Sequence, residues 1–154
     1  MSQGGYYHDW RDIPDSLWEL CPNFHPSTDK MLPSPDNGEF YFDIPSMMGL
    51  QSLREKLDRP VRINSGRRSE WYNATIGGAP RSQHFQKIAF DIDFWYTGHD
   101  PLLMKYVLLS RGFTGIGLYR TFIHADRGRR REWWGSQEAK DYWNSVQKDI
   151  IVLE

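Results

Sequence analysis

Two histidines and one aspartate constrain this chain more than any other feature of its sequence. His84 and Asp91 lie in one segment, and His124 lies in a second segment further along the chain. Two imidazoles and one carboxylate suit zinc, and three protein ligands leave a fourth coordination position open for water, as in catalytic zinc sites. Structural zinc sites usually close with cysteines, whereas Cys21 is the only cysteine here. The three residues therefore predict a hydrolytic Zn²⁺ site and a fold that brings both segments together.

The composition indicates a globular chain that is large enough to bury a core. The 154 residues are 39% hydrophobic and 25% charged, which excludes a disordered chain. A net charge of −1 gives no electrostatic argument for nucleic acid or for an anionic membrane. No apolar run approaches the roughly 18 residues that a membrane span needs. Residues 1–15 lack the apolar core of a signal peptide, so we expect synthesis as a soluble cytoplasmic protein.

Turn signals and hydrophobic spacing predict an α+β fold in a single domain over residues 1–154. The proline-rich residues 1–45 are expected to form an irregular N-terminal arm that wraps this domain. Helices are expected at 46–58 with Ser46 as N-cap, at 69–75, at 100–112 with Asp100 as N-cap, and from Ser136 onward. Strands are expected at 61–64, 88–95, 115–119 and 122–126. Without βαβ regularity, these strands predict a small antiparallel sheet flanked by helices.

Four motifs follow one another between about residue 50 and residue 133. They are Ser65-Gly-Arg-Arg-Ser with Asn73, Ser82-x-His with Ala89-x-Asp, Gly115-Ile-Gly-x-Tyr, and Phe122-Ile-His-x-Asp with its continuation to Trp133. In this order they resemble the zinc D-alanyl-D-alanine carboxypeptidase superfamily, whose members cut peptidoglycan peptides. It includes L-alanyl-D-glutamate endopeptidases, phage endolysins and murein cross-link endopeptidases. The resemblance implies a Hedgehog-like zinc peptidase fold, with Zn²⁺ held by His84, Asp91 and His124.

Two positions depart from the pattern of that family. Lys87 stands three residues after the first ligand, where the family often has glycine, so we expect a different turn into the next strand. Thr121 stands three residues before the last histidine, where many relatives carry a glutamate as general base. The resemblance therefore implies the metal ligands and leaves the identity of the base open.

Asp126 is the preferred candidate for that base. It lies two residues after His124, so on a shared strand both side chains project to one face. A carboxylate beside the water of a zinc site can act as a general base. The alternative is an acid that orients the imidazole of a ligand, as zinc sites often contain.

Three further residues are candidates for contacts with the substrate. The resemblance implies that Arg68 binds the substrate and offsets charge that develops on the scissile carbonyl oxygen. A surface salt bridge is the alternative, and Arg67 is the neighbour with which it could be confused. Ser82 is expected to bond to backbone or to a substrate carboxylate. Tyr119 is either a donor to the oxyanion or substrate, or a packed strand aromatic.

The basic run at residues 127–131 has three interpretations. Such a run is usually a solvated hairpin. It could instead attract anionic wall polymers, or nucleic acid.

The three ligands predict a zinc hydrolase, and the resemblance implies a metallopeptidase, a D,D-carboxypeptidase or an endopeptidase, that acts on peptidoglycan stem peptides or cross-links. The missing signal peptide favours a phage-type endolysin that a holin releases, or an enzyme delivered by a virion. The alternatives are a non-catalytic zinc-containing binding module, like the Hedgehog signalling domain, and a virion structural module of the same fold. The bond that is cut, the origin of the chain and its oligomeric state are left open.

Overall fold

A computed structural model describes the backbone of residues 4–153 and the side chains of residues 4–147. Residues 1–3 and 154 of the expected domain lie outside the described residues. The strands are β1 (Gly5–Tyr7), β2 (Phe40–Phe42), β3 (Ile63–Ser65), β4 (Ala89–Asp93), β5 (Gly115–Leu118), β6 (Phe122–Asp126) and β7 (Arg131–Trp134). The helices are the 3-10 helix η1 (Trp10–Asp12), α1 (Asp15–Trp18), α2 (Ile44–Leu57), α3 (Glu70–Thr75), α4 (Gln83–Gln86), α5 (Pro101–Ser110) and α6 (Gln137–Leu153).

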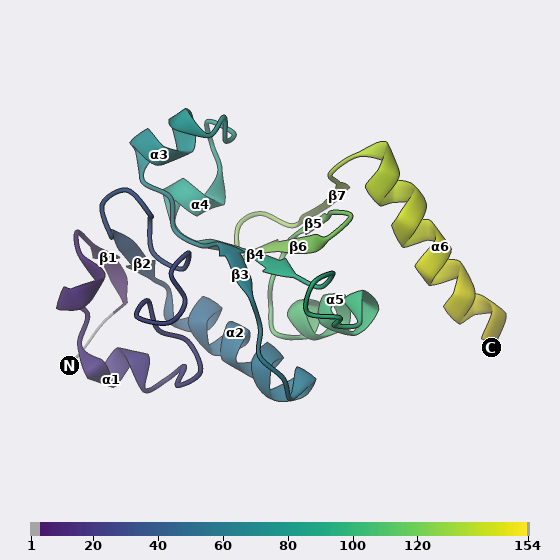
Figure 1. Ribbon diagram of the computed structural model, residues 1–154, viewed down its shortest axis with the longest axis horizontal. Coiled ribbons are helices and arrows are strands. Elements are labelled where there is room, and N and C mark those ends of the chain that lie inside the picture. The colour runs from purple at the N-terminus through teal and green to yellow at the C-terminus, as the bar shows by residue number, and fades with distance from the viewer. Residues whose placement is uncertain (1–3, 154) are drawn as a thin grey trace.

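The centre of the molecule is a five-stranded sheet with the order β3-β4-β6-β5-β7 (Figure 1). The predicted α+β class is confirmed, and β6 has the expected bounds. The sheet is antiparallel except at one edge, where β7 pairs in parallel with β5. Strand β7 was not expected, because its first residue belongs to the basic run that resembles a solvated hairpin.

Alternation along the strands gives the sheet two different faces. One face carries apolar residues such as Phe90, Ile116 and Ile123, which join one buried cluster with residues of α2 and α5. The other face carries Asp91, from β4, and its cross-strand partner His124, from β6. The polar candidate site therefore lies on the side of the sheet opposite to α2 and α5.

The N-terminal arm is more ordered than its proline content suggests. Its strands β1 and β2 form a second, two-stranded sheet, and Trp18, Phe24 and Leu32 are buried in the same apolar cluster as the rest of the chain. Helix α2 also begins earlier than expected. The prediction of Ser46 as N-cap is wrong, because the carboxylate of Asp43 accepts the hydrogen bond of the Ser46 amide and Pro45 occupies the first turn.

The ends of the other elements follow from side chains that satisfy exposed backbone groups. Asp100 caps α5 as predicted, and the hydroxyl of Ser136 accepts from the Ala139 amide at the start of α6. Strand β4 ends at Asp93, two residues earlier than expected, because the carboxylate of Asp93 accepts from the amides of Tyr96 and Thr97 in a turn.

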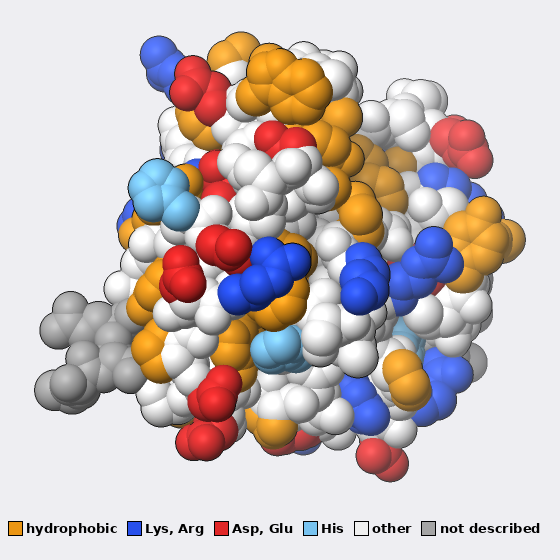
Figure 2. All heavy atoms as spheres, turned by 60° about the vertical axis from the view of Figure 1, so that its left-hand side comes forward, with side chains coloured by type: hydrophobic (Ala, Val, Ile, Leu, Met, Phe, Trp, Pro, Cys, Tyr) orange, Lys and Arg blue, Asp and Glu red, His pale blue; other side chains and the backbone are white. Residues whose placement is uncertain are grey.

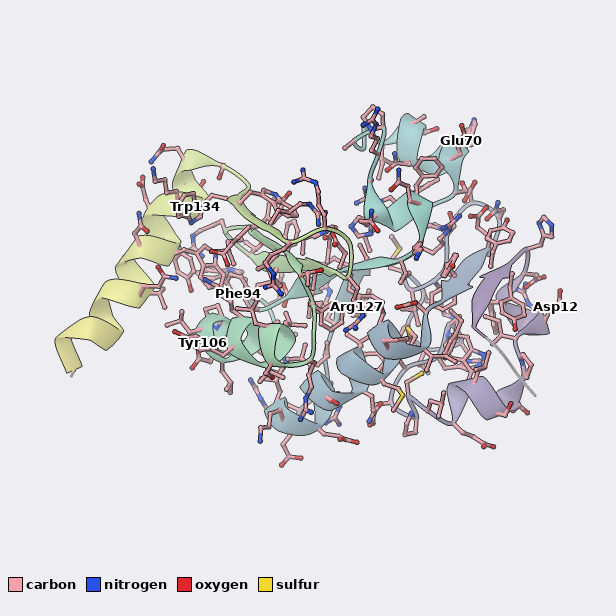
Figure 3. The ribbon with its side chains drawn as sticks, turned by 180° about the vertical axis from the view of Figure 1, so that it is seen from behind. Asp12, Glu70, Phe94, Tyr106, Arg127 and Trp134 are labelled. Carbon is pink, nitrogen blue, oxygen red and sulfur yellow. The ribbon has the colours of Figure 1, made fainter. Side chains whose placement is uncertain are left out.

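Helix α6 packs against the edge of the sheet through aromatic side chains. Trp143 is fully buried, and its indole nitrogen donates to the carbonyl of Tyr119 over 2.8 Å. The ring of Phe94 stacks on Tyr142, and Figure 3 shows Phe94 and Trp134 on the side of the sheet nearest to α6. Within residues 4–153, none of the helices is both long and apolar enough to cross a membrane.

Candidate metal site

His84 is presented by the short helix α4. Its backbone amide donates to the hydroxyl of Ser82, the N-cap, so Ser82 bonds to backbone, one of its two expected roles. Nδ1 of His84 lies 2.7 Å from the carbonyl oxygen of Gly66 and must carry the hydrogen of that bond. The lone pair of Nε2 is thereby directed at Oδ1 of Asp91, 3.2 Å away.

Asp91 and His124 face each other across β4 and β6. They are paired in register, and Nδ1 of His124 lies 3.2 Å from the same Oδ1 of Asp91. Nε2, on the other side of the His124 ring, lies 2.6 Å from Oδ2 of Asp126. Because a carboxylate only accepts, Nε2 carries the hydrogen of that bond and Nδ1 keeps its lone pair for the centre.

The three groups form a donor set that fits a metal ion. One ligand atom each from His84, Asp91 and His124 lies within 4.8 Å of the other two, and all three residues are buried. Two imidazole nitrogens and a carboxylate oxygen converge with their lone pairs pointing inward, and the outer N–H group of each imidazole donates to another group of the protein. A buried centre of this kind is costly without a cation, and the donor types suit zinc.

Electrostatics at the centre favour charged carboxylates. Burial alone raises the pKa of Asp91, but when His84 and His124 are protonated on the nitrogens that face it, as zinc does not allow, their positive charge and hydrogen bonds outweigh burial and hold that pKa well below its ordinary range. Burial likewise opposes the ionisation of Asp126, yet the hydrogen bonds of His124 and Arg131 lower its pKa to about 2. Both carboxylates are therefore anionic at neutral pH.

The surroundings of Asp126 favour the orienting role over the general-base role. As predicted, it shares a strand face with His124, but its side chain is 0% exposed and both oxygens are engaged. Oδ1 accepts from Nη1 of Arg131 and the amide of Gly128, each over 2.9 Å, and Oδ2 accepts from Nη2 of Arg131 over 2.7 Å and from His124. Gly115 lies opposite, where a Cβ atom would collide with the Asp126–Arg131 pair.

Arg68 lies beside the metal ligands, with 14% of its side chain exposed. Its guanidinium donates to the hydroxyl of Ser65, to the side-chain oxygen of Asn73 and, over 3.4 Å, to Oδ2 of Asp91. This last contact turns Oδ1 of Asp91 toward the histidines. A simple surface salt bridge does not describe this arrangement.

Arg67 points away from the site and has a structural role. It is buried, pairs with Glu39 over 2.7 Å and donates to the carbonyl of Lys87 over 2.8 Å. The pair ties the N-terminal arm to the turn between α4 and β4. Arg67 thereby holds the backbone of this turn in place at Lys87.

Tyr119 and Trp133 form a pair near the centre that the sequence did not indicate. The indole nitrogen of Trp133 donates to the hydroxyl oxygen of Tyr119 over 3.2 Å, and the Trp133 ring lies 5.1 Å from the ring of His124. Because the indole is only a donor, the hydroxyl of Tyr119 keeps its own hydrogen, and no described residue accepts it. Gly117 leaves the space that the Trp133 ring occupies.

The metal ligands lie in a cleft of about 740 Å³. One wall is the loop and helix at 76–84, in the α3–α4 region that projects from the sheet (Figure 1), and the other wall comes from residues 119–133. Arg68, Ser82 and Tyr119 line the cleft, whereas Asp126 does not. The structure thus brings together the predicted ligands and substrate contacts and leaves Asp126 behind His124.

Comparison with protein families gives one match. A family model described as Peptidase M15 matches residues 28–126, well over half of the chain, and includes all three candidate ligands. Among curated proteins, no sequence matches.

Proposed function

Because this chain belongs to the peptidase M15 family, we propose that it is a zinc metallopeptidase that cleaves peptide bonds in peptidoglycan stem peptides or cross-links. Members of this family depend on zinc, and the buried group of His84, Asp91 and His124 can hold the ion. The observation that carries the proposal is the convergence of three lone-pair donors in a cleft large enough for a small ligand.

Bound zinc supplies a Lewis acid that polarises a carbonyl and lowers the pKa of water to about 7. The protein contributes the positions of the other groups. Arg68 reaches the cleft beside Asp91 and can donate to the scissile carbonyl oxygen as negative charge develops there. The free hydrogen of Tyr119 is a second donor for the same oxygen or for a neighbouring group of the substrate.

In this proposal Asp126 and Arg131 hold the ligand His124 in its tautomer and ring orientation. Asp126 accepts the outer hydrogen of the imidazole, and the two-pronged contact with Arg131 fixes the carboxylate in turn. Such partners raise the basicity of a ligand imidazole and reduce its freedom to rotate.

The same proposal includes release by a holin or delivery with a virion, and an activity that is either that of a carboxypeptidase or that of an endopeptidase. The resemblance to endolysins and murein endopeptidases supports this part of the proposal.

A non-catalytic binding module is the second candidate, and one observation favours it. Among the described residues that line the cleft, the carboxylates are Asp91, which faces the histidines, and Glu132, which pairs with Lys105 over 3.2 Å. Asp91 is directed at the histidines and Glu132 at α5 on the opposite side of the sheet, so neither is positioned as a general base at the metal ligands. A protein that binds wall peptides without cutting them would need no such group.

Mass spectrometry of muropeptides after digestion of purified walls separates the two candidates. The zinc-loaded protein should release new termini at one type of bond, chelation should stop the release, and added zinc should restore it. The His84→Ala variant should neither bind zinc nor release products. Zinc bound at one equivalent with intact muropeptides would favour the binding module.

A further inference from the structure

The cleft is strongly basic although the chain as a whole is not. Four arginines line the cleft together with two carboxylates, whereas the net charge of the protein is −1. Charge is unevenly spread over the surface, and Figure 2 shows one face on which most basic side chains lie toward the right and most acidic ones toward the left. A cleft with an excess of one sign of charge concentrates ligands of the opposite sign.

Two of the four arginines are already committed to partners in the protein. Arg68 contacts Asp91, and Arg131 holds Asp126. The other two, Arg81 and Arg129, are exposed and make no side-chain hydrogen bond or ion pair with any described residue. Their charges are therefore available to a ligand in the cleft.

These two arginines come from both walls of the cleft. Arg81 lies in the loop between α3 and α4, and Arg129 lies between β6 and β7. A guanidinium presents a planar fork of donors that matches a carboxylate. A peptide bound across the metal ligands between these walls would bring its acidic groups to them.

We propose that Arg81 and Arg129 form an anion-binding subsite. This subsite selects peptides that carry a free carboxylate beside the peptide bond that lies over the metal ligands. The subsite rests on the proposed function, since it is the peptide substrate that places the carboxylate there. It distinguishes a glutamate or diamino-acid carboxylate from the corresponding carboxamide, which has lost the charge.

The test uses the zinc-loaded protein and a matched pair of uncleavable peptides, in which a ketomethylene link replaces the scissile amide. One peptide carries the free D-glutamate carboxylate and the other carries its carboxamide. Calorimetry should show about tenfold tighter binding of the acid, the usual scale for a charge-assisted contact. In the double variant Arg81→Gln, Arg129→Gln this ratio should fall close to one.

Arg130 provides the matched control. It is an exposed arginine on the same turn and does not line the cleft, so Arg130→Gln should keep the tenfold preference. Equal binding of acid and amide by the wild type, or a preference that survives in the double variant, would overturn the proposal. Displacement of both peptides by inorganic phosphate, without preference for the acid, would reassign the arginines to a phosphate polymer and also overturn it.

Activity is scored separately from this binding. Cleavage of free and amidated muropeptides at equal rates together with equal binding refutes the subsite and leaves the proposed function standing. Acid-selective binding without any cleavage refutes the proposed hydrolase and supports the subsite.

Discussion

Nε2 of His124 and Oδ2 of Asp126 lie 2.6 Å apart, on the side of the imidazole that points away from Asp91. The carboxylate therefore contacts the back of a metal ligand and is separated from the cleft by the ring. The two roles that the sequence left open for Asp126 can therefore be distinguished by experiment. Loss of an orienting residue lowers zinc affinity, whereas loss of a general base lowers turnover.

The Asp126→Asn variant should bind zinc about 10- to 100-fold more weakly, the usual effect of removing a partner of a ligand histidine. The reason is that an amide no longer matches both Arg131 and the outer hydrogen of His124. Zinc affinity is measured by competition with a chelator, and turnover is then measured with zinc in excess.

Turnover with excess zinc should recover to within a few-fold of the wild type. If Asp126 were the general base, zinc affinity would be unchanged and turnover would fall by about 10²-fold or more. That second pattern would return Asp126 to the catalytic role.

The Arg68→Ala variant should keep its zinc and its fold, but its kcat/KM should fall. The fall should correspond to a loss of about 2–4 kcal/mol of transition-state stabilisation. The guanidinium lines the cleft beside Asp91, where it can reach a developing oxyanion. Arg68→Lys should recover only part of the loss, because lysine keeps the charge without the planar fork. A wild-type kcat/KM in Arg68→Ala would mean that this arginine only orients the carboxylate of Asp91.

Arg67→Ala should instead destabilise the protein, by about 3–5 kcal/mol, because it leaves Glu39 buried without its partner. Denaturant unfolding of the zinc-loaded protein measures this loss. At a temperature where the variant is folded, its kcat/KM should stay near the wild-type value. An unchanged midpoint with reduced kcat/KM would show that the two adjacent arginines have exchanged roles.

The sequence predicted those parts of the site that depend on short-range spacing. The residues from Phe122 to Asp126 alternate as a strand, and the register of β4 against β6 then brings Asp91 opposite His124. The capping of α5 by Asp100 was also local, because the cap and the helix are adjacent in the chain. These features need no information about distant partners.

The remaining parts depend on contacts that local patterns do not encode. Arg131 belongs to a run of arginines that looks solvated, and only the parallel pairing of β7 with β5 brings it to Asp126. Trp133 reaches Tyr119 by the same pairing. Arg67 and Arg68 are adjacent and identical in type, so their different directions follow from partners at Glu39 and Asp91, far away in the sequence.

Zinc uptake by the metal-free protein should release protons and should weaken as the pH falls. Burial lowers the pKa of His124, but its hydrogen bonds to Asp126 and Asp91 outweigh this and raise that pKa above its ordinary value. A raised pKa makes the protonated imidazole persist to higher pH, and zinc needs the neutral form. Below the raised pKa, apparent affinity should fall about tenfold per pH unit for each proton displaced.

Calorimetric zinc titrations in buffers of different ionisation enthalpy count the released protons. The stability of the metal-free protein has the opposite pH dependence from its zinc affinity. A raised histidine pKa stabilises the fold at low pH, and this contribution is lost as the pH rises through the raised pKa. Zinc affinity that does not change between pH 8 and pH 5 (about three units around the ordinary histidine value) would contradict a site with two histidine ligands.

Tyr119→Phe should lower kcat by about 10- to 100-fold with little change in KM, because the lost hydroxyl hydrogen is a donor that no residue described in the structure accepts. Trp133→Phe keeps an aromatic ring beside His124 and removes the indole N–H together with the five-membered ring, so it should lower kcat through the orientation of Tyr119. The double variant should then be no slower than Tyr119→Phe alone, since the Trp133 indole can orient no hydroxyl once that of Tyr119 has been removed. Zinc content, measured in each variant, should stay at one equivalent. Losses that multiply in the double variant would show that Trp133 acts independently of Tyr119, through its packing on the metal ligand.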